Sequence, residues 1–143
     1  MPPQYGGSSG GSQPVQYNIL NRGFKNVSQN GQVTGFQLLV LSGYYRGVYL
    51  TLVEGFEVTV DGESFKRDQI RCTFGARTYT QDQLEGLSDA RWQWDEPVTL
   101  TVSKPGGLKP GMHDVQVVAR IRVSYMPVQP SVYTFKAKVP LIS

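Results

Sequence analysis

The residue types that most often carry catalysis form no recognisable motif in this 143-residue chain. Hydrolysis of glycosides usually needs two positioned carboxylates. The acids that stand near one another are Asp82, Glu85, Asp89, Asp95 and Glu96. They fall in expected loops or in a short helix, so we interpret them as solvated surface charge.

The chain has one histidine, His113, and one cysteine, Cys72. A zinc site built from protein ligands wants several His or Cys residues, so the sequence predicts no metal site here. It shows neither a nucleophile-elbow pattern nor a glycine loop that precedes a helix and could hold a phosphate. We interpret Cys72 as a small buried hydrophobe and His113 as a structural or surface histidine. An enzyme that uses His113 with a carboxylate stays an alternative, but no catalytic residue is assigned.

Composition indicates a packed domain and argues against several partners. Apolar residues make up 39% of the chain and charged residues 17%, which favours a folded core over disorder. The net charge is +3, but the basic residues are scattered, whereas a nucleic-acid site wants a cluster. No apolar run is long enough for a membrane span and no secretory signal is visible. With a single cysteine, a reducing compartment fits, so we predict a cytoplasmic protein that binds neither nucleic acid nor membrane.

The chain divides into a short tail and one domain. Residues 1–14 read MPPQYGGSSGGSQP, a composition that cannot form a core and is typical of flexible segments. We predict a disordered N-terminal tail over 1–14 and a single domain over 15–143.

Strand patterns dominate the domain. Apolar and polar residues alternate over 56–60, 98–103, 115–125 and 133–139, as in strands with one buried face. Asp61-Gly62 is a tight hairpin signal. One short helix is expected over 81–87, with Thr80 as its N-cap. Many strands and almost no helix predict an all-β fold, an antiparallel β-sandwich.

Two expected strands, over 36–41 and 48–53, are apolar on both faces. Leu39 and Leu41 lie opposite the core-facing positions of the first, and Tyr49 and Val53 lie opposite those of the second. A sandwich strand normally turns polar residues outward. Either a loop or the N-terminal segment covers these side chains, or another protein does. Tyr44, Tyr45 and Arg46 lie in the turn between the strands, and aromatic and Arg residues are enriched at interface centres.

Trp92 and Trp94 also allow two interpretations, one structural and one functional. Two positions apart in an extended stretch, they would share one face. They either belong to the core or a lid over one end of the sandwich, or they contact a partner or stack on a sugar.

Four longer segments give the chain a specific resemblance. They read NRGFKNV from Asn21, VTGFQLLVLSGYYRGVYLTLVEGFEVTVDGE from Val33, IRCTFGARTYTQDQL from Ile70, and RWQWDEPVTLTVSKPGGLKPGMHDVQVVARIRVSYMP from Arg91. Together they resemble the β subunit of bacterial C-glycoside deglycosidases, over nearly all of the chain after Asn21.

The resemblance implies a β-sandwich subunit that assembles with a larger catalytic α subunit. That α subunit would be a barrel of the xylose isomerase type and would hold a divalent metal, commonly Mn²⁺. Its substrates would be 3-oxo-glycosides of flavonoids or related polyphenols, joined through carbon and in some cases oxygen. A base would remove the proton on C2 of the sugar, and elimination would release the aglycone. No cofactor is expected in the present chain.

The role that follows for this chain is non-catalytic: it would stabilise the α subunit and help to shape its pocket. The residues predicted to contact the partner are Leu39, Leu41, Tyr44, Tyr45, Arg46, Tyr49, Trp92 and Trp94. The alternative is a carbohydrate-binding module that acts alone.

Overall fold

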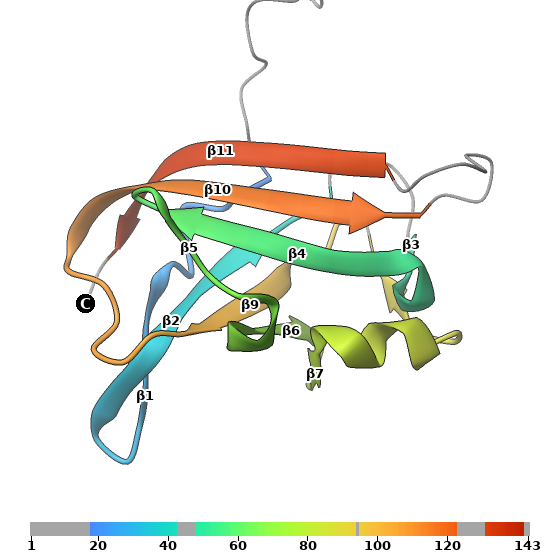
Figure 1. Cartoon of the computed structure of the whole chain (residues 1–143), viewed down its shortest axis with the longest axis horizontal. Helices are drawn as coiled ribbons and strands as arrows, with labels where there is room; N and C mark the ends of the chain where they lie inside the picture. Colours follow the sequence, from blue (N-terminus) through green and yellow to red (C-terminus); the bar gives the residue numbers. More distant parts are fainter. Residues whose placement is uncertain (1–17, 43–47, 94, 123–130, 142–143) are drawn as a thin grey trace, which may run out of the picture.

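The computed structural model describes residues 18–42, 48–93, 95–122 and 131–141, and its strands form two layers (Figure 1). The first layer is a five-stranded antiparallel sheet in the order β1-β2-β9-β6-β7. Its strands are β1 (Lys25–Gln29), β2 (Gln32–Val40), β9 (Val98–Ser103), β6 (Ile70–Phe74) and β7 (Arg77–Thr80).

The second layer is a four-stranded antiparallel sheet in the order β11-β10-β4-β5. Its strands are β11 (Ser131–Leu141), β10 (Gly111–Ile121), β4 (Val53–Val60) and β5 (Glu63–Ser64). A two-stranded ribbon pairs β3 (Val48–Tyr49) with β8 (Arg91–Trp92). The remaining described elements are short 3₁₀ helices: η2 (Leu50–Leu52), η3 (Arg67–Gln69) and η4 (Gln81–Gly86). The predicted all-β antiparallel fold is confirmed, and η4 stands where the one short helix was expected.

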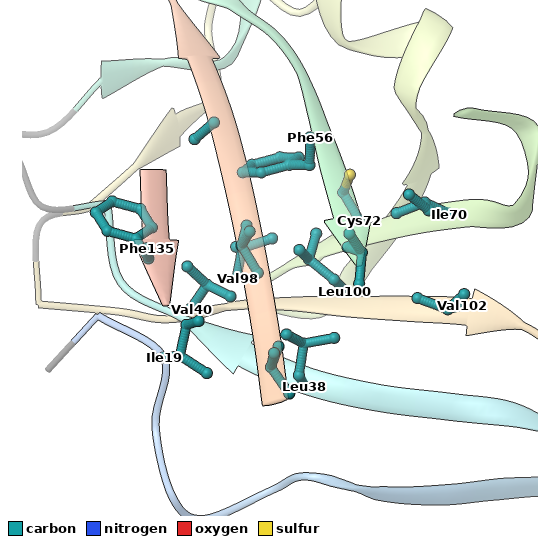
Figure 2. Close-up of a cluster of buried hydrophobic side chains, with 14 of the residues drawn as sticks. Ile19, Leu38, Val40, Phe56, Ile70, Cys72, Val98, Leu100, Val102 and Phe135 are labelled. Atoms are coloured by element: carbon teal, nitrogen blue, oxygen red, sulfur yellow. The ribbon is translucent and has the colours of Figure 1, made fainter. Parts of the chain in front are cut away.

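The inward faces of both sheets meet in one hydrophobic core (Figure 2). The first sheet contributes side chains such as Leu38 of β2 and Leu100 of β9, and the second contributes Val58 of β4 and Val117 of β10. All four are at most 1% exposed. The alternation that predicted these strands therefore identified their core faces correctly.

Two hairpins turn on residues with positive φ. Asp61 and Gly62, with φ of 50° and 85°, join β4 to β5 as predicted. Asn30 and Gly31, with φ of 52° and 80°, join β1 to β2 in the same way. Both pairs fit the type I′ turn, whose twist matches that of the flanking strands. The Asn-Gly signal was present in the sequence, and it would have predicted the β1–β2 hairpin.

The strand expected over 48–53 is wrong. β3 ends at Tyr49, η2 follows over Leu50–Leu52, and β4 begins at Val53. A 3₁₀ turn has three residues per turn, so Leu50 and Val53 both face the core and are 0% and 2% exposed. The sequence looks apolar on both faces here because the backbone changes from the two-residue period of a strand to the three-residue period of a 3₁₀ turn.

The other boundaries differ less. η4 ends at Gly86, and the Thr80 N–H donates to Gln83 Oε1 at 2.8 Å in front of it, as an N-cap position would. β10 begins at Gly111, four residues before the expected start. The expected end of that strand (residues 123–125) and the predicted tail (1–14) lie outside the described residues.

Candidate functional site

The residues predicted to meet a partner fall into two sets. Tyr44, Tyr45, Arg46 and Trp94 lie outside the described residues. Leu39, Leu41, Tyr49 and Trp92 are described, and each stands in a different environment.

Leu39 lies on the outward face of β2, between the core residues Leu38 and Val40. It is nevertheless only 9% exposed. The backbone at Gly23 packs directly on its side chain, so closely that a Cβ built on Gly23 would lie 2.6 Å from Leu39 Cγ. The Leu20 N–H also donates to the Leu39 carbonyl at 3.0 Å. The chain's own segment before β1 therefore covers Leu39, which is the first of the two explanations considered from sequence.

Leu41 follows β2 and is half-buried. Its N–H donates to the Asn18 carbonyl at 2.7 Å, and Asn18 Nδ2 donates back to the Leu41 carbonyl at 3.4 Å. Ile19 forms an isolated antiparallel bridge with Val40. Residues 18–20 therefore run beside the end of β2 and extend its hydrogen bonding.

Tyr49 is the most exposed of the four described predictions, at 42%. It pairs with Arg91 across the β3–β8 ribbon, and the Arg91 guanidinium carbon lies 4.5 Å from the centre of its ring. This is a cation–π arrangement. An exposed aromatic ring stacked on Arg is suited to protein contact, so Tyr49 stays a prediction for the interface.

Trp92 is 1% exposed. Its ring meets Phe56 and Phe74 edge-on at centroid distances of 5.5 and 5.7 Å. Its Nε1–H donates to the Glu96 carbonyl at 2.9 Å, so the polar end of the indole is also satisfied. The indole belongs to the core, and in this conformation it offers no surface to a partner or to a sugar ring.

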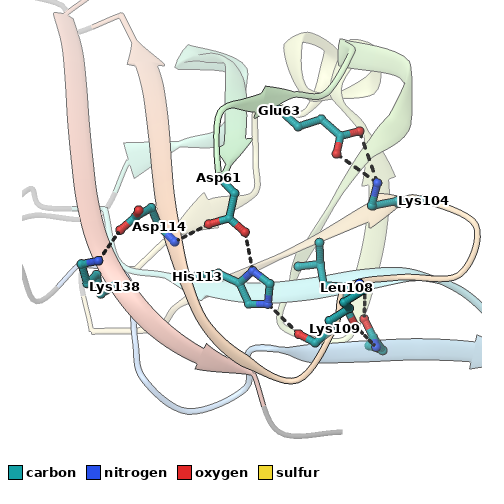
Figure 3. Close-up of polar contacts among 9 residues, drawn as sticks. Asp61, Glu63, Lys104, Leu108, Lys109, His113, Asp114 and Lys138 are labelled. Carbon is teal, nitrogen blue, oxygen red and sulfur yellow. Dashed lines mark hydrogen bonds and ion pairs between the residues drawn. The ribbon is translucent and has the colours of Figure 1, made fainter.

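Sequence reasoning did not find the partners of His113, which come from two other segments (Figure 3). His113 Nδ1 lies 2.6 Å from Asp61 Oδ2, at the β4–β5 turn. His113 Nε2 lies 2.6 Å from the Lys109 carbonyl oxygen, in the loop before β10. The other oxygen of Asp61 accepts the Asp114 N–H at 2.8 Å. The register of β10 against β4 brings Asp61 to His113, and no local spacing in the sequence encodes that contact, whereas Lys109 lies only four residues before His113.

The protonation of this pair follows from its contacts. Burial by itself lowers the pKa of His113, but the hydrogen bonds to Asp61 and to the Lys109 carbonyl outweigh it and raise the pKa above the ordinary 6.5. The hydrogen bonds from His113 and from the Asp114 N–H hold the pKa of Asp61 below 3.8. Both ring nitrogens face acceptors, an arrangement that favours the imidazolium form, in which both nitrogens carry hydrogen. A ring without a free lone pair cannot act as a general base.

Cys72 is also unsuited to act as a nucleophile. Burial raises the pKa of the Cys72 thiol to about 12, so the thiolate that a nucleophile requires does not form near neutral pH. Among the described residues, no group of three or more His, Cys, Asp or Glu side chains could hold a metal ion. Within the same residues, no helix is both long and apolar enough to cross a membrane.

Comparison with known proteins gives the same family by two routes. The family model described as C-glycoside deglycosidase beta subunit matches residues 15–125. A curated protein of Eubacterium cellulosolvens, named C-glycoside deglycosidase beta subunit, is 39% identical over 110 residues. That alignment covers 76% of the present chain and 75% of the relative.

Proposed function

The chain belongs to the C-glycoside deglycosidase beta subunit family, and on this premise we propose that it is a non-catalytic subunit that stabilises a larger catalytic one and helps to shape its pocket. It is a subunit of a deglycosidase complex, and the designation beta implies an alpha partner. We further propose that this partner is a barrel of the xylose isomerase type and that the complex works in the cytoplasm. The single buried cysteine suits that compartment.

The proposed substrates are 3-oxo-glucosides of flavonoids or related polyphenols. A ketone at C3 acidifies the proton on C2, and a base on the larger subunit removes it. The electron pair left on C2 forms the C1=C2 double bond as the bond from C1 to the aglycone breaks. The aglycone carbon takes up a proton, or its oxygen does when the bond is C–O. The products are an unsaturated keto-sugar and the free aglycone.

The divalent metal implied by the family does not fit the described part of this chain. Its acids, its one histidine and its one cysteine form no cluster of three. The histidine is doubly hydrogen-bonded and the cysteine is buried. We therefore assign the metal, taken as Mn²⁺, to the larger subunit and derive no step through it.

The observation that carries the non-catalytic role is the His113–Asp61 contact. A histidine oriented by an aspartate is a common general base in enzymes. Here the second ring nitrogen, Nε2, is occupied by the Lys109 carbonyl at 2.6 Å, so neither nitrogen can accept a proton from a substrate. The pair instead joins the β4–β5 turn to the start of β10.

Exchange of His113 for Gln in the assembled complex tests this role. We expect unchanged turnover per complex, because the ring is structural, together with a lower melting temperature of the isolated chain. Gln116→Ala, on the outward face of the same strand, is the matched control for expression and assembly. A loss of turnover by His113→Gln in complexes that assemble normally would contradict the proposal. Sugar binding by the chain alone, with no assembly, would favour the carbohydrate-binding alternative.

A further inference from the structure

The outer edge of β4, on the side away from β10, is paired with a strand over only part of its length. β5 pairs with the last two residues of β4, and the Phe65 N–H then donates to the Val58 carbonyl at 3.1 Å. Nearer the start of β4, no described strand pairs with this side. Main-chain groups of alternate residues face the same edge of a strand, so those of Phe56 and Glu54 follow Val58 along it. Buried main-chain groups require hydrogen-bond partners, and these two residues must find them outside the sheet.

The side chain of Gln81, in η4, supplies both partners for Phe56. Gln81 Oε1 accepts the Phe56 N–H at 2.5 Å, and Gln81 Nε2 donates to the Phe56 carbonyl at 3.2 Å. These are the two reciprocal hydrogen bonds that a residue of a neighbouring antiparallel strand would make. Gln81 Nε2 also donates to the Arg67 carbonyl at 3.2 Å, and Gln81 is only 2% exposed. A buried amide is costly unless it is hydrogen-bonded, and both ends of this one are.

Arg67, in η3, continues this cover at Glu54. Arg67 Nη1 donates to the Glu54 carbonyl at 2.9 Å, and Arg67 Nε donates to Asp82 Oδ1 at 2.9 Å. Gly55 leaves the space that these side chains occupy, because a Cβ on it would run into Arg67 Nη1 and would lie 2.7 Å from Gln81 Oε1. Side chains from η3 and η4 therefore cover the edge of β4 where β5 does not.

The helix that carries Gln81 is fixed at both ends. Gln81 and Leu84 lie one 3₁₀ turn apart and so share a face of η4, and Leu84 is 0% exposed in the core. At the other end, Thr51 Oγ1 donates to the Glu85 carbonyl at 2.6 Å. These contacts hold the Gln81 amide in position against Phe56.

We propose that Gln81 and Arg67 close the edge of β4 in place of a strand and thereby keep it from pairing with a second copy of the chain. An uncovered strand edge is a template on which another chain adds a strand. The closure concerns this chain alone, so it does not depend on the proposed function.

A second copy is the occupant that the uncovered edge would fit. In an antiparallel pair centred on Phe56, the two copies of this residue would exchange both N–H···O bonds, as Phe56 now does with the Gln81 amide. The same register would set Glu54 opposite Val58 and Gly55 opposite Glu57, so no two carboxylates would face each other. Like charges therefore do not oppose this pairing, and the side chains of η3 and η4 stand in its way.

Amide hydrogen exchange of the full-length chain tests the closure. In the unmodified chain, we expect the Phe56 N–H to exchange within about tenfold of the rate of Val117, which lies at the centre of the same sheet. Gln81→Ala removes the acceptor and joins the edge to the adjoining recess of about 520 Å³. The rate of Phe56 relative to Val117 should then rise at least about tenfold. A loss of global stability alone would accelerate both amides and leave this ratio unchanged.

Sedimentation of the full-length chain over a range of concentrations tests the consequence. Gln81→Ala combined with Arg67→Ala uncovers the whole edge, and we expect self-association at least about tenfold stronger than that of the unmodified chain. In the associated form, the Phe56 N–H should again exchange slowly, because the second copy accepts it. The matched control combines Gln116→Ala with Arg77→Ala, which removes one glutamine and one arginine from other strands. We expect the control to associate as the unmodified chain does.

Each other outcome overturns a stated part of the proposal. Fast exchange of Phe56 in the unmodified chain would show that the edge is open, and this result needs no variant to fold. An unchanged ratio in Gln81→Ala would show that Gln81 does not close the edge. Gln81→Glu keeps an acceptor for the Phe56 N–H, so a rise in the ratio as large as that of Gln81→Ala would contradict the assigned hydrogen bond. A raised ratio in Gln81→Ala without stronger self-association of the double variant would show that the closure does not prevent pairing with a second copy.

Discussion

His113 shows how a residue with catalytic potential is committed to structure. Its two ring nitrogens contact the Asp61 carboxylate and the Lys109 carbonyl, and Phe24 packs edge-on against the ring with 5.8 Å between centroids. The residue is 9% exposed. The sequence alone favoured a structural or a surface histidine at this position. Its contact with Asp61 could not be predicted, since it depends on the β4–β5 turn and on the register of β10 against β4.

The His113–Asp61 pair predicts a pH-dependent stability. The folded pKa of His113 is raised, so its contribution is fully present below 6.5 and is lost as pH rises through the folded pKa. The folded pKa of Asp61 is lowered, so its contribution is present above 3.8 and is lost as pH falls through that pKa. We expect the difference in unfolding free energy between the parent chain and His113→Gln to be largest between these limits. Urea denaturation across the pH range measures it.

A difference that stays constant from about pH 5 to about pH 9 would contradict the imidazolium assignment. Gln116→Ala is again the control, because Gln116 is on the same strand but carries no titratable group.

At the scale of elements, the alternation of apolar and polar residues predicted the strands that have the core on one face and solvent on the other. Val98, Leu100 and Val102 of β9 are all 0% exposed, as their spacing indicated. The same reasoning was wrong at Leu50–Leu52, where a 3₁₀ turn between β3 and β4 imitates a strand that is apolar on both faces. It was inconclusive at Leu39, because the cover comes from a segment nearly twenty residues away in the sequence.

The β2–β9 pairing predicts one position at which no side chain fits. A Cβ on Gly35 would lie 1.9 Å from the Val102 carbonyl oxygen. The strands would have to separate there, so we expect Gly35→Ala to cost at least about 1–3 kcal/mol of unfolding free energy. Gly86→Ala is the matched control, because nothing lies within 4 Å of a Cβ at that position. We expect that change to stay within about 0.5 kcal/mol. Equal stability of the two variants in denaturant titrations would show that the β2–β9 contact is looser than described.

At the scale of the whole molecule, physical pattern alone leads to a small β-sandwich, and the longer sequence segments identify the family. The core faces and the Asp61-Gly62 hairpin could both be read from local sequence. The row of outward threonines across the first sheet could not. Thr99, Thr73 and Thr78 come from separate strands, and only the order β9-β6-β7 places them on one face. Tyr49 and Arg91 likewise meet only through the ribbon.

The most direct measurement of the central claim is release of aglycone from a 3-oxo-C-glucoside by each purified subunit alone and by the two together. The account predicts that the present chain alone is inactive, that the larger subunit alone is unstable or weakly active, and that mixing restores full turnover at the stoichiometry of the complex. Full turnover by the present chain, purified free of the larger subunit, would contradict the account.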